Sequence, residues 1–291
     1  MVNGANPNET MKLLYERASC RSFKEEPIPD ETLDAVLMAA TCAATGGNLQ
    51  PYSVIRVLDA QVRQRLMALC DDQPFIGKAP VNLVFCIDFH RLERWAALEN
   101  APFSARRAFR HFWISLQDVV ICAQTVCTAA DAMGLGAVYV GTVLECLEEL
   151  KDLLKLPKGV FPVVMVCLGY PKGQLTQRRK FGVDVVVHDE TYHEMTDEEL
   201  LRAFDEKYGG QTFEATPERV DSIAQACREV HGEGYTEEFL ARVKRDGHLN
   251  MAQNVFGLKY PADEMPRRNR YIMGAARNAG FEWFDQGSEE Q

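Results

Sequence analysis

The apolar stretch of residues 114–133 constrains the fold of this chain more than any other segment. It is long enough to cross a bilayer, but it contains the polar residues Gln117, Asp118, Gln124 and Asp131. Polar groups at that density are too costly in a membrane span. We therefore expect a buried core helix, closed by Gly134 as its C-cap, around which the rest of the domain packs.

The segments on either side of this helix carry the patterns of strands and amphipathic helices. Residues 81–88 are almost continuously apolar, which is typical of a strand at the centre of a sheet. Helices are expected at residues 30–42, 59–72 and 144–155, and further strands at 52–58, 136–141 and 160–168. Strands and helices in this order predict an α+β domain with a central sheet flanked by helices.

The character of the chain changes at about residue 190. From there it becomes charged and helical, with a capping box at Thr196–Glu199 and a candidate hinge at Gly209 and Gly210. We expect two parts: residues 1–190 as the main domain, and residues 191–291 as a helical C-terminal extension packed on it. The sequence does not assign a role to the extension.

The charge balance excludes an extended nucleic-acid surface. The formal net charge of the 291 residues is −10, whereas nucleic-acid binding requires a basic face. Residues 89–113 interleave aromatic residues with arginines, a pattern that could stack bases. On an acidic chain, a wall or lid over a planar ligand, or the ordinary packing of a helical pair, are the better interpretations, and the sequence leaves both open.

Cysteine and histidine usage indicates a reduced, metal-free protein. The nine cysteines lie scattered in apolar runs without a C-x-x-C pair, which is typical of buried free thiols. His188 and His193 are five residues apart and do not share a helix face, so no metal site is expected. Because residues 1–6 lack the features of a signal peptide, we expect a cytoplasmic protein without a membrane anchor.

The stretch from Arg17 to Phe23 combines two arginines with a hydroxyl residue. On a helical turn, Arg17 and Arg21 would face one way and Ser19 would reach the same region. Guanidinium and hydroxyl groups together suit an oxygen-rich anion such as a phosphate. Taken alone, the same pattern also fits an ordinary solvated basic patch.

Two glycine-containing loops are further candidates for ligand contact. The loop of residues 43–51 has two glycines followed by Asn48 and Gln50, whose amides can both donate and accept hydrogen bonds, although such residues are also common in plain turns. Residues 134–142 do not match a dinucleotide-binding fingerprint, because a helix precedes them and the glycine spacing is wrong. A backbone approach to a ligand is expected where the strand ends at Gly141.

Taken in order, these motifs resemble the nitroreductase family of FMN-dependent enzymes. The resemblance covers residues 11–188 and rests on R-x-S-x-R-x-F, T-x-x-N-x-Q-P, G-L-G-x-x-Y-V-G, and L-G-Y-P followed by basic residues. The chain departs from the family pattern in having Thr45 where serine is common and Ala44 where proline is common. Residues beyond 190 carry no motif that we can assign to this family.

The resemblance implies a mixed or antiparallel central sheet and a homodimer that binds FMN non-covalently at the subunit interface. Arg17 and Ser19 would hold the phosphate, and Arg21 would lie by the pyrimidine edge, where a positive charge tunes the ring. Asn48 would bond the ring, from its own or the other subunit. The remaining assignments by resemblance are Gln50 near the ring, the backbone of Val140 and Gly141 near its reactive nitrogen, and Arg178 and Lys180 at the phosphate.

The implied activity is transfer of hydride from NAD(P)H through the flavin to a small planar acceptor, such as a nitroaromatic, a quinone or a flavin, with ping-pong kinetics. The flavin carries the chemistry, so no catalytic side chain is nominated. Two alternatives remain: the same fold used for reductive dehalogenation or flavin fragmentation, and a low-turnover flavin-binding sensor or carrier. The sequence does not specify the acceptor, the preferred nicotinamide, or whether residues 89–113 contact substrate.

Overall fold

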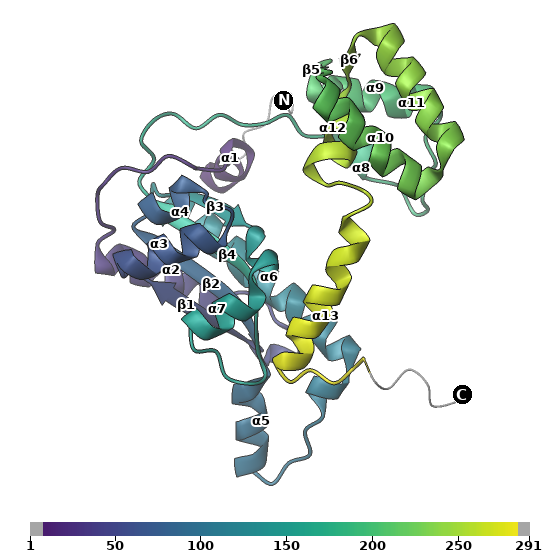
Figure 1. The fold of residues 1–291 in the computed structure, drawn as a ribbon. Coiled ribbons are helices and arrows are strands. Elements are labelled where there is room, and N and C mark those ends of the chain that lie inside the picture. The colour runs from purple at the N-terminus through teal and green to yellow at the C-terminus, as the bar shows by residue number, and fades with distance from the viewer. Residues whose placement is uncertain (1–7, 285–291) are drawn as a thin grey trace. The chain divides into compact units, whose positions relative to one another are not determined.

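The computed structural model describes residues 8–284, which form two compact units (Figure 1). The first unit contains the chain up to Gln177 and the segment from Ile272 onward, and the second contains Arg178–Tyr271. The chain therefore returns to the first unit at its C-terminal end. The two units meet in sequence after Gln177. The expected division into domains at residue 190 stays a prediction.

A four-stranded antiparallel sheet is the centre of the first unit (Figure 1). Its spatial order is β1 (Tyr52–Val57), β2 (Val81–Asp88), β4 (Val160–Gly169) and β3 (Gly136–Val140). All eight residues of β2 are buried, as its apolar run predicted. The ladder between β2 and β4 is irregular at Phe85 and Cys86, and Pro162 sits beside this irregularity, where a proline is tolerated in a strand.

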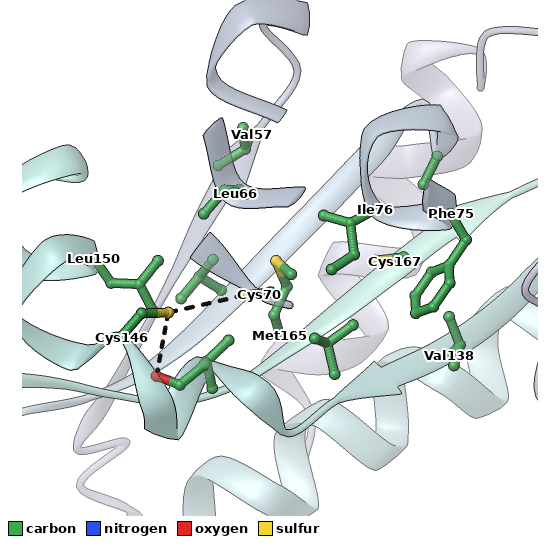
Figure 2. Packing of buried hydrophobic residues seen from close by; sticks show 14 of the residues in the cluster. Val57, Leu66, Cys70, Phe75, Ile76, Val138, Cys146, Leu150, Met165 and Cys167 are labelled. Carbon is green, nitrogen blue, oxygen red and sulfur yellow. Dashed lines mark hydrogen bonds between the residues drawn. The ribbon is translucent and has the colours of Figure 1, made fainter. Parts of the chain in front are cut away.

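One face of the sheet packs against three helices, which are α3 (Ala60–Leu69), α4 (Pro74–Lys78) and α7 (Leu147–Leu153). Figure 2 shows this cluster, in which Leu66, Ile76 and Leu150 from the helices meet Met165 and Cys167 from β4. Burial of these side chains contributes on the order of 1.5–3 kcal/mol each. The alternate residues of β2, such as Leu83 and Phe85, are buried outside this cluster and so face the other way.

Helix α6 (Phe109–Ala132) contacts all four strands and α2 (Asp30–Thr41). By length and composition alone it could cross a membrane. One side of it, which includes Val119, Cys122 and Val126, is buried in the core as expected, whereas Val120 and Ile121 on another side are exposed. It begins five residues earlier than the sequence pattern indicated, so Phe109 and Trp113 belong to its first turns. Gly134 follows the cap residue Met133 with a φ of 73°, the left-handed conformation expected of a helix-ending glycine.

Aromatic side chains join residues 89–113 to the C-terminal end of the chain. Phe281, which is 1% exposed, contacts Phe89, Phe112 and Phe161. In sequence order the other short elements of this unit are α1 (Glu9–Glu16), η1 (Gly46–Asn48), α5 (Phe89–Leu98), η2 (Ala105–Arg107) and η3 (Thr142–Glu145). Several aromatics of residues 89–113 therefore serve ordinary packing, while Trp95 and Trp113 stay exposed.

The second unit is a separate helical body. Its core joins Ile223 and Ala224 of α10 (Pro217–His231) to Phe239 and Val243 of α11 (Glu233–Asp246). The predicted capping box forms at Thr196, which begins α9 (Asp197–Tyr208). Its other elements are α8 (Val183–Val186), β5 (Phe213–Glu214), β6 (His248–Leu249), α12 (Met251–Asn254), the π-helix η4 (Val255–Lys259) and η5 (Met265–Arg268). Helix α13 (Asn269–Asn278) leads from this unit back to the first.

Candidate functional site

The segment of residues 17–23 is extended, and this corrects the expected helical turn. Arg17 ends α1 with a φ of −56° and a ψ of 129°. Ser19 then pairs with Ala137 of the edge strand β3, and the N–H of Cys20 donates to the carbonyl of Ala137 at 3.0 Å. In an extended chain alternate residues share a side. Ala18 and Cys20 are accordingly buried, whereas Ser19 and Arg21 are exposed.

Gly136 makes this approach to β3 possible. A Cβ atom at this glycine would lie 2.5 Å from Cys20 Cβ and 2.8 Å from Cys20 Sγ. Such distances are shorter than real side-chain contacts, so a larger residue would push the segment away from the strand. The glycine of the G-L-G motif is thus required by the close packing of the Arg17–Arg21 segment.

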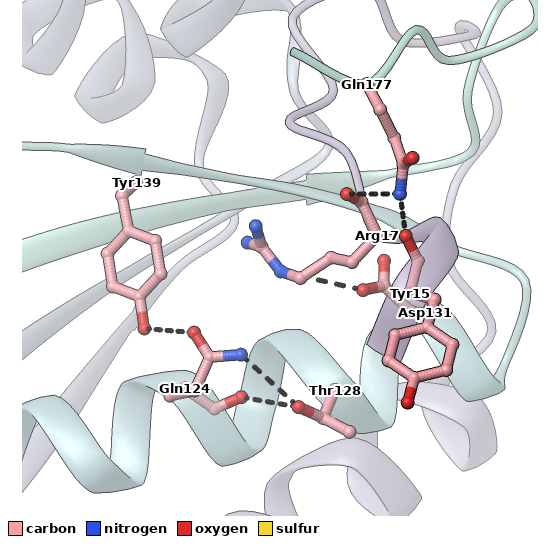
Figure 3. Close-up of polar contacts among 7 residues, drawn as sticks. All are labelled: Tyr15, Arg17, Gln124, Thr128, Asp131, Tyr139 and Gln177. Carbon is pink, nitrogen blue, oxygen red and sulfur yellow. Dashed lines mark hydrogen bonds and ion pairs between the residues drawn. The ribbon is translucent and has the colours of Figure 1, made fainter. Parts of the chain in front are cut away.

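The side chain of Arg17 extends toward α6, where one acidic residue only partly compensates its positive charge. Its Nε atom is 3.7 Å from Oδ2 of Asp131, which is an ion-pair distance but too long for a hydrogen bond (Figure 3). Nε and Nη2 are buried and lack a hydrogen-bond partner among the described residues, as does Asp131 Oδ2. Buried guanidinium donors without acceptors are costly, and an anion binding there would satisfy them.

The surroundings of Arg17 are poorly solvated. Burial raises the pKa of Asp131 from 3.8 to about 6, and the positive charge of Arg17 opposes this shift. Burial also raises the pKa of Cys127 and of Tyr139, and Arg17 opposes both shifts. The Tyr139 hydroxyl donates to Gln124 at 3.3 Å on the α6 surface (Figure 3). A charge–charge contact in this environment is screened less than one in open solvent.

Gln177 ties the chain after β4 to the same place. Its side-chain amide donates to the carbonyl of Tyr15 and, at 3.4 Å, to that of Arg17 (Figure 3). Arg178 and Lys180 come next in the sequence; both are exposed and belong to the second unit. Binding of the phosphate by Arg178 and Lys180 stays a prediction. Arg179, between them, donates to the carbonyl of Glu206 at 3.1 Å.

The loop containing Asn48 and Gln50 is held by Asp118 of α6. Both carboxylate oxygens of Asp118 accept from the N–H of Gly46, at 3.0 and 3.2 Å, and burial raises the pKa of this carboxyl group. Asn48 and Gln50 have φ angles of 55° and 47°. Asn48 has an exposed side chain, whereas the side-chain amide of Gln50 donates to the carbonyl of Thr41. Of the two residues, Asn48 is therefore the one whose side chain is more accessible to a ligand.

The end of β3 presents backbone rather than side chains. Val140 is buried opposite Met165. Gly141 is exposed and has no atom within 4 Å of where a Cβ would point. The strand end thus leaves space beside Gly141, and a backbone contact with a ligand there stays a prediction. Since Ser19 pairs with Ala137 in the same strand, the segment with the two arginines and Gly141 share the β3 edge of the sheet.

Within one chain, the predicted FMN-binding residues of the first unit lie in two separate groups, one near Arg17 and one near Asn48. Arg17 meets α6 at Asp131, and the loop of Asn48 meets α6 at Asp118. These positions are thirteen residues apart, or about 20 Å along a helix. Sequence reasoning missed both aspartates as supports of the site. Their signal was present, since each is an acid on an otherwise apolar helix.

Comparisons with known proteins identify the family. The nitroreductase family model matches residues 14–170. The oxygen-insensitive NADPH nitroreductase of Salmonella typhimurium is 33% identical over 198 residues, which cover 68% of this chain and 80% of that protein. The FMN reductase (NAD(P)H) of Bacillus subtilis is 34% identical over 206 residues, covering 69% and 81%.

Among solved structures, the NADPH:FMN oxidoreductase from Vibrio harveyi complexed with NAD+ has the same fold. Its TM-score is 0.70 at 24% identity, and the match covers 94% of this chain and 99% of that one. The shared fold therefore extends beyond residue 190. From the family match and the two relatives in sequence, the chain belongs to the nitroreductase family.

Proposed function

We propose that the protein is an FMN-dependent oxidoreductase that passes hydride from NADH or NADPH to a small planar acceptor. The observation that carries this proposal is the partly buried guanidinium of Arg17, whose Nε and Nη2 atoms are buried without hydrogen-bond acceptors among the described residues. Family membership and the names of the relatives, an NADPH nitroreductase and an FMN reductase, support it.

In this proposal the residues of the β3 edge bind and orient the cofactor. Arg17 and Ser19 donate hydrogen bonds to the phosphate, and these charge-assisted bonds hold an anion on an acidic protein. Arg21 contributes positive charge at the pyrimidine edge. The open backbone at Gly141, after Val140, lets the ring approach the strand end. The assignments of Arg178 and Lys180 to the phosphate rest on the family resemblance alone.

Asn48, near Gln50, would bond the flavin ring from the partner protomer. The separation of about 20 Å along α6 between the Arg17 and Asn48 contacts favours this arrangement over a site built within one chain. The side of α6 that carries Trp113, Val120 and Ile121 supports a homodimer, because these large apolar residues are exposed in the monomer.

Bound FMN would supply the redox chemistry, accepting hydride from the nicotinamide and passing it to the acceptor. The protein's part is to bind, orient and tune, and no side chain of the site is placed as a general acid. Alternating use of one pocket by donor and acceptor gives ping-pong kinetics. All nine cysteines are free thiols, which supports a cytoplasmic location.

Anaerobic reduction of the reconstituted protein tests this function. The purified chain is loaded with FMN and mixed with NADPH or NADH. We expect the flavin absorbance to bleach, and to return when a nitroaromatic or a quinone is added. A flavin that stays oxidised with both nucleotides would refute the reductase, and a chain that takes up no FMN would refute any flavin function.

A further inference from the structure

Cys70 and Cys146 form a buried thiol pair in the first unit. Their Sγ atoms are 3.9 Å apart although the residues are 76 positions apart in sequence, and the two side chains are 0% and 4% exposed (Figure 2). Cys70 caps the C-terminus of α3, and Cys146 lies at the N-terminus of α7. Among the described cysteines, these two have their sulfur atoms in contact.

The two thiols differ in chemical character. Either thiol can donate in the contact between Cys70 and Cys146, and this hydrogen bond lowers the pKa of Cys70 against the opposing effect of burial. The same hydrogen bond and burial raise the pKa of Cys146. Cys86 and Cys167, elsewhere in the same core, have their pKa raised by burial. The sulfur contact of 3.9 Å places the two thiols within reach of each other. The lowered pKa of Cys70 favours its thiolate, which is the reactive form of a cysteine.

The geometry points to an oxidation site in which Cys70 and Cys146 close to a disulfide in response to a hydroperoxide. The Cys70 thiolate attacks the peroxide, its sulfur is oxidised to a sulfenic acid, and the O–O bond breaks. The other oxygen leaves as hydroxide, or as an alkoxide that takes a proton from water to become an alcohol. The sulfur of Cys146 then attacks the sulfenic acid, the S–S bond forms, and the oxygen leaves as water with the thiol proton. One peroxide is reduced by two electrons for each disulfide.

The disulfide would fasten the segment after Gly141 to the end of α3. Cys146 follows η3 (Thr142–Glu145) directly. Gln73, which caps the N-terminus of α4, already links the two sides, because its Nε2 donates to the carbonyl of Cys70 at 3.0 Å and to Thr142 Oγ1 at 2.9 Å. The oxidation state of this pair therefore acts on the segment that continues from the β3 edge, whether or not that edge holds a flavin.

Disulfide mapping of the full-length protein tests the proposal. The reduced protein is treated with hydrogen peroxide, alkylated in denaturant and digested with trypsin and a glutamate-specific protease. Arg65 and Lys78 flank Cys70. Glu145 separates Cys146 from Cys122 and Cys127, and Glu148 separates it from Cys167, so the linked peptides are unique. We expect a Cys70–Cys146 cross-link and the joint loss of both thiols from the alkylated fraction.

Substitutions assign the roles of the two sulfurs. In Cys146→Ser the cross-link should disappear and Cys70 should react with dimedone, which traps sulfenic acids. Cys167→Ser, a control in the same core, should keep the cross-link. The exposed Cys42 serves as an internal marker that peroxide has acted. If Cys42 is oxidised in the wild-type protein while Cys70 and Cys146 both remain alkylatable, the proposal is wrong, and this result does not depend on how any variant folds.

Discussion

At the scale of residues, Arg17 and Asp131 form an incomplete ion pair. The 3.7 Å separation and the unpartnered atoms on both sides leave each charge under-compensated. A half-buried pair of this kind gives little net stability, because desolvation offsets the attraction. We infer that the pair preorganises a binding site. Asp131 orients the guanidinium of Arg17, and a bound anion would accept hydrogen bonds from its unpartnered donors.

The Asp131→Asn substitution tests how much stability the folded protein loses by holding an ionised carboxylate at this position. The pKa of Asp131 is raised in the folded protein to about 6, so the native state holds its proton more tightly than the unfolded chain does. Stability should therefore fall as pH rises through the window from about 4 to about 6. Asparagine does not ionise, so the variant should not lose stability in this range. At pH 7 we expect it to be more stable than the wild type by about 1–3 kcal/mol, at about 1.4 kcal/mol per pKa unit.

Urea unfolding of the flavin-free protein between pH 4 and pH 8 measures this difference. The exposed Asp152 of α7 provides a matched control, since Asp152→Asn should follow the wild type at every pH. Equal stability of wild type and Asp131→Asn throughout the range would show that Asp131 is not held in a desolvated site.

At the scale of elements, the segment of residues 17–23 lies along the open edge of β3, where Ser19 pairs with Ala137 in an isolated bridge. Only a glycine at position 136 lets Cys20 come so close. We expect Gly136→Ala to displace the segment, to lower the free energy of unfolding by about 1–3 kcal/mol and to weaken FMN retention. Gly173→Ala is the control, because a Cβ there meets no atom within 4 Å.

Chemical denaturation and FMN fluorescence quenching measure the two effects. Coincident curves for Gly136→Ala and Gly173→Ala would contradict the close packing of this segment against β3.

The elements that the sequence predicted best are those decided by local pattern. Residues 81–88 form β2 over the expected range, and the capping box at Thr196 begins α9. The helical turn at Arg17 was wrong because pairing with Ala137, a contact across more than a hundred residues, overrides the local arginine spacing. Asp118 and Asp131 were visible as acids on an apolar helix, but their partners Gly46 and Arg17 are set by tertiary packing.

At the scale of the whole molecule, the exposed apolar side of α6 predicts self-association. Placing a charge in the centre of this surface would leave it desolvated and unpaired in a dimer. We expect Ile121→Glu to shift the protein from dimer to monomer and to reduce FMN retention, since Asn48 would act across the interface. Leu98→Glu on α5, at a 74% exposed position, should leave the dimer intact.

Sedimentation velocity gives the oligomeric state of each variant. A wild-type protein that sediments as a monomer at every concentration would contradict the dimer, and an Ile121→Glu dimer would place the interface elsewhere.

The central claim is that Arg17 presents its free donors to the phosphate of FMN, and the measurement that tests it most directly compares FMN with riboflavin, which lacks the phosphate. Fluorescence quenching gives both dissociation constants for the wild type, for Arg17→Ala and for Arg65→Ala, a control at an exposed arginine of α3. A bond to a charged group contributes about 1.5–3 kcal/mol, so Arg17→Ala should bind FMN about 10- to 100-fold more weakly and riboflavin unchanged, while Arg65→Ala matches the wild type. Unchanged FMN affinity in Arg17→Ala would contradict the account.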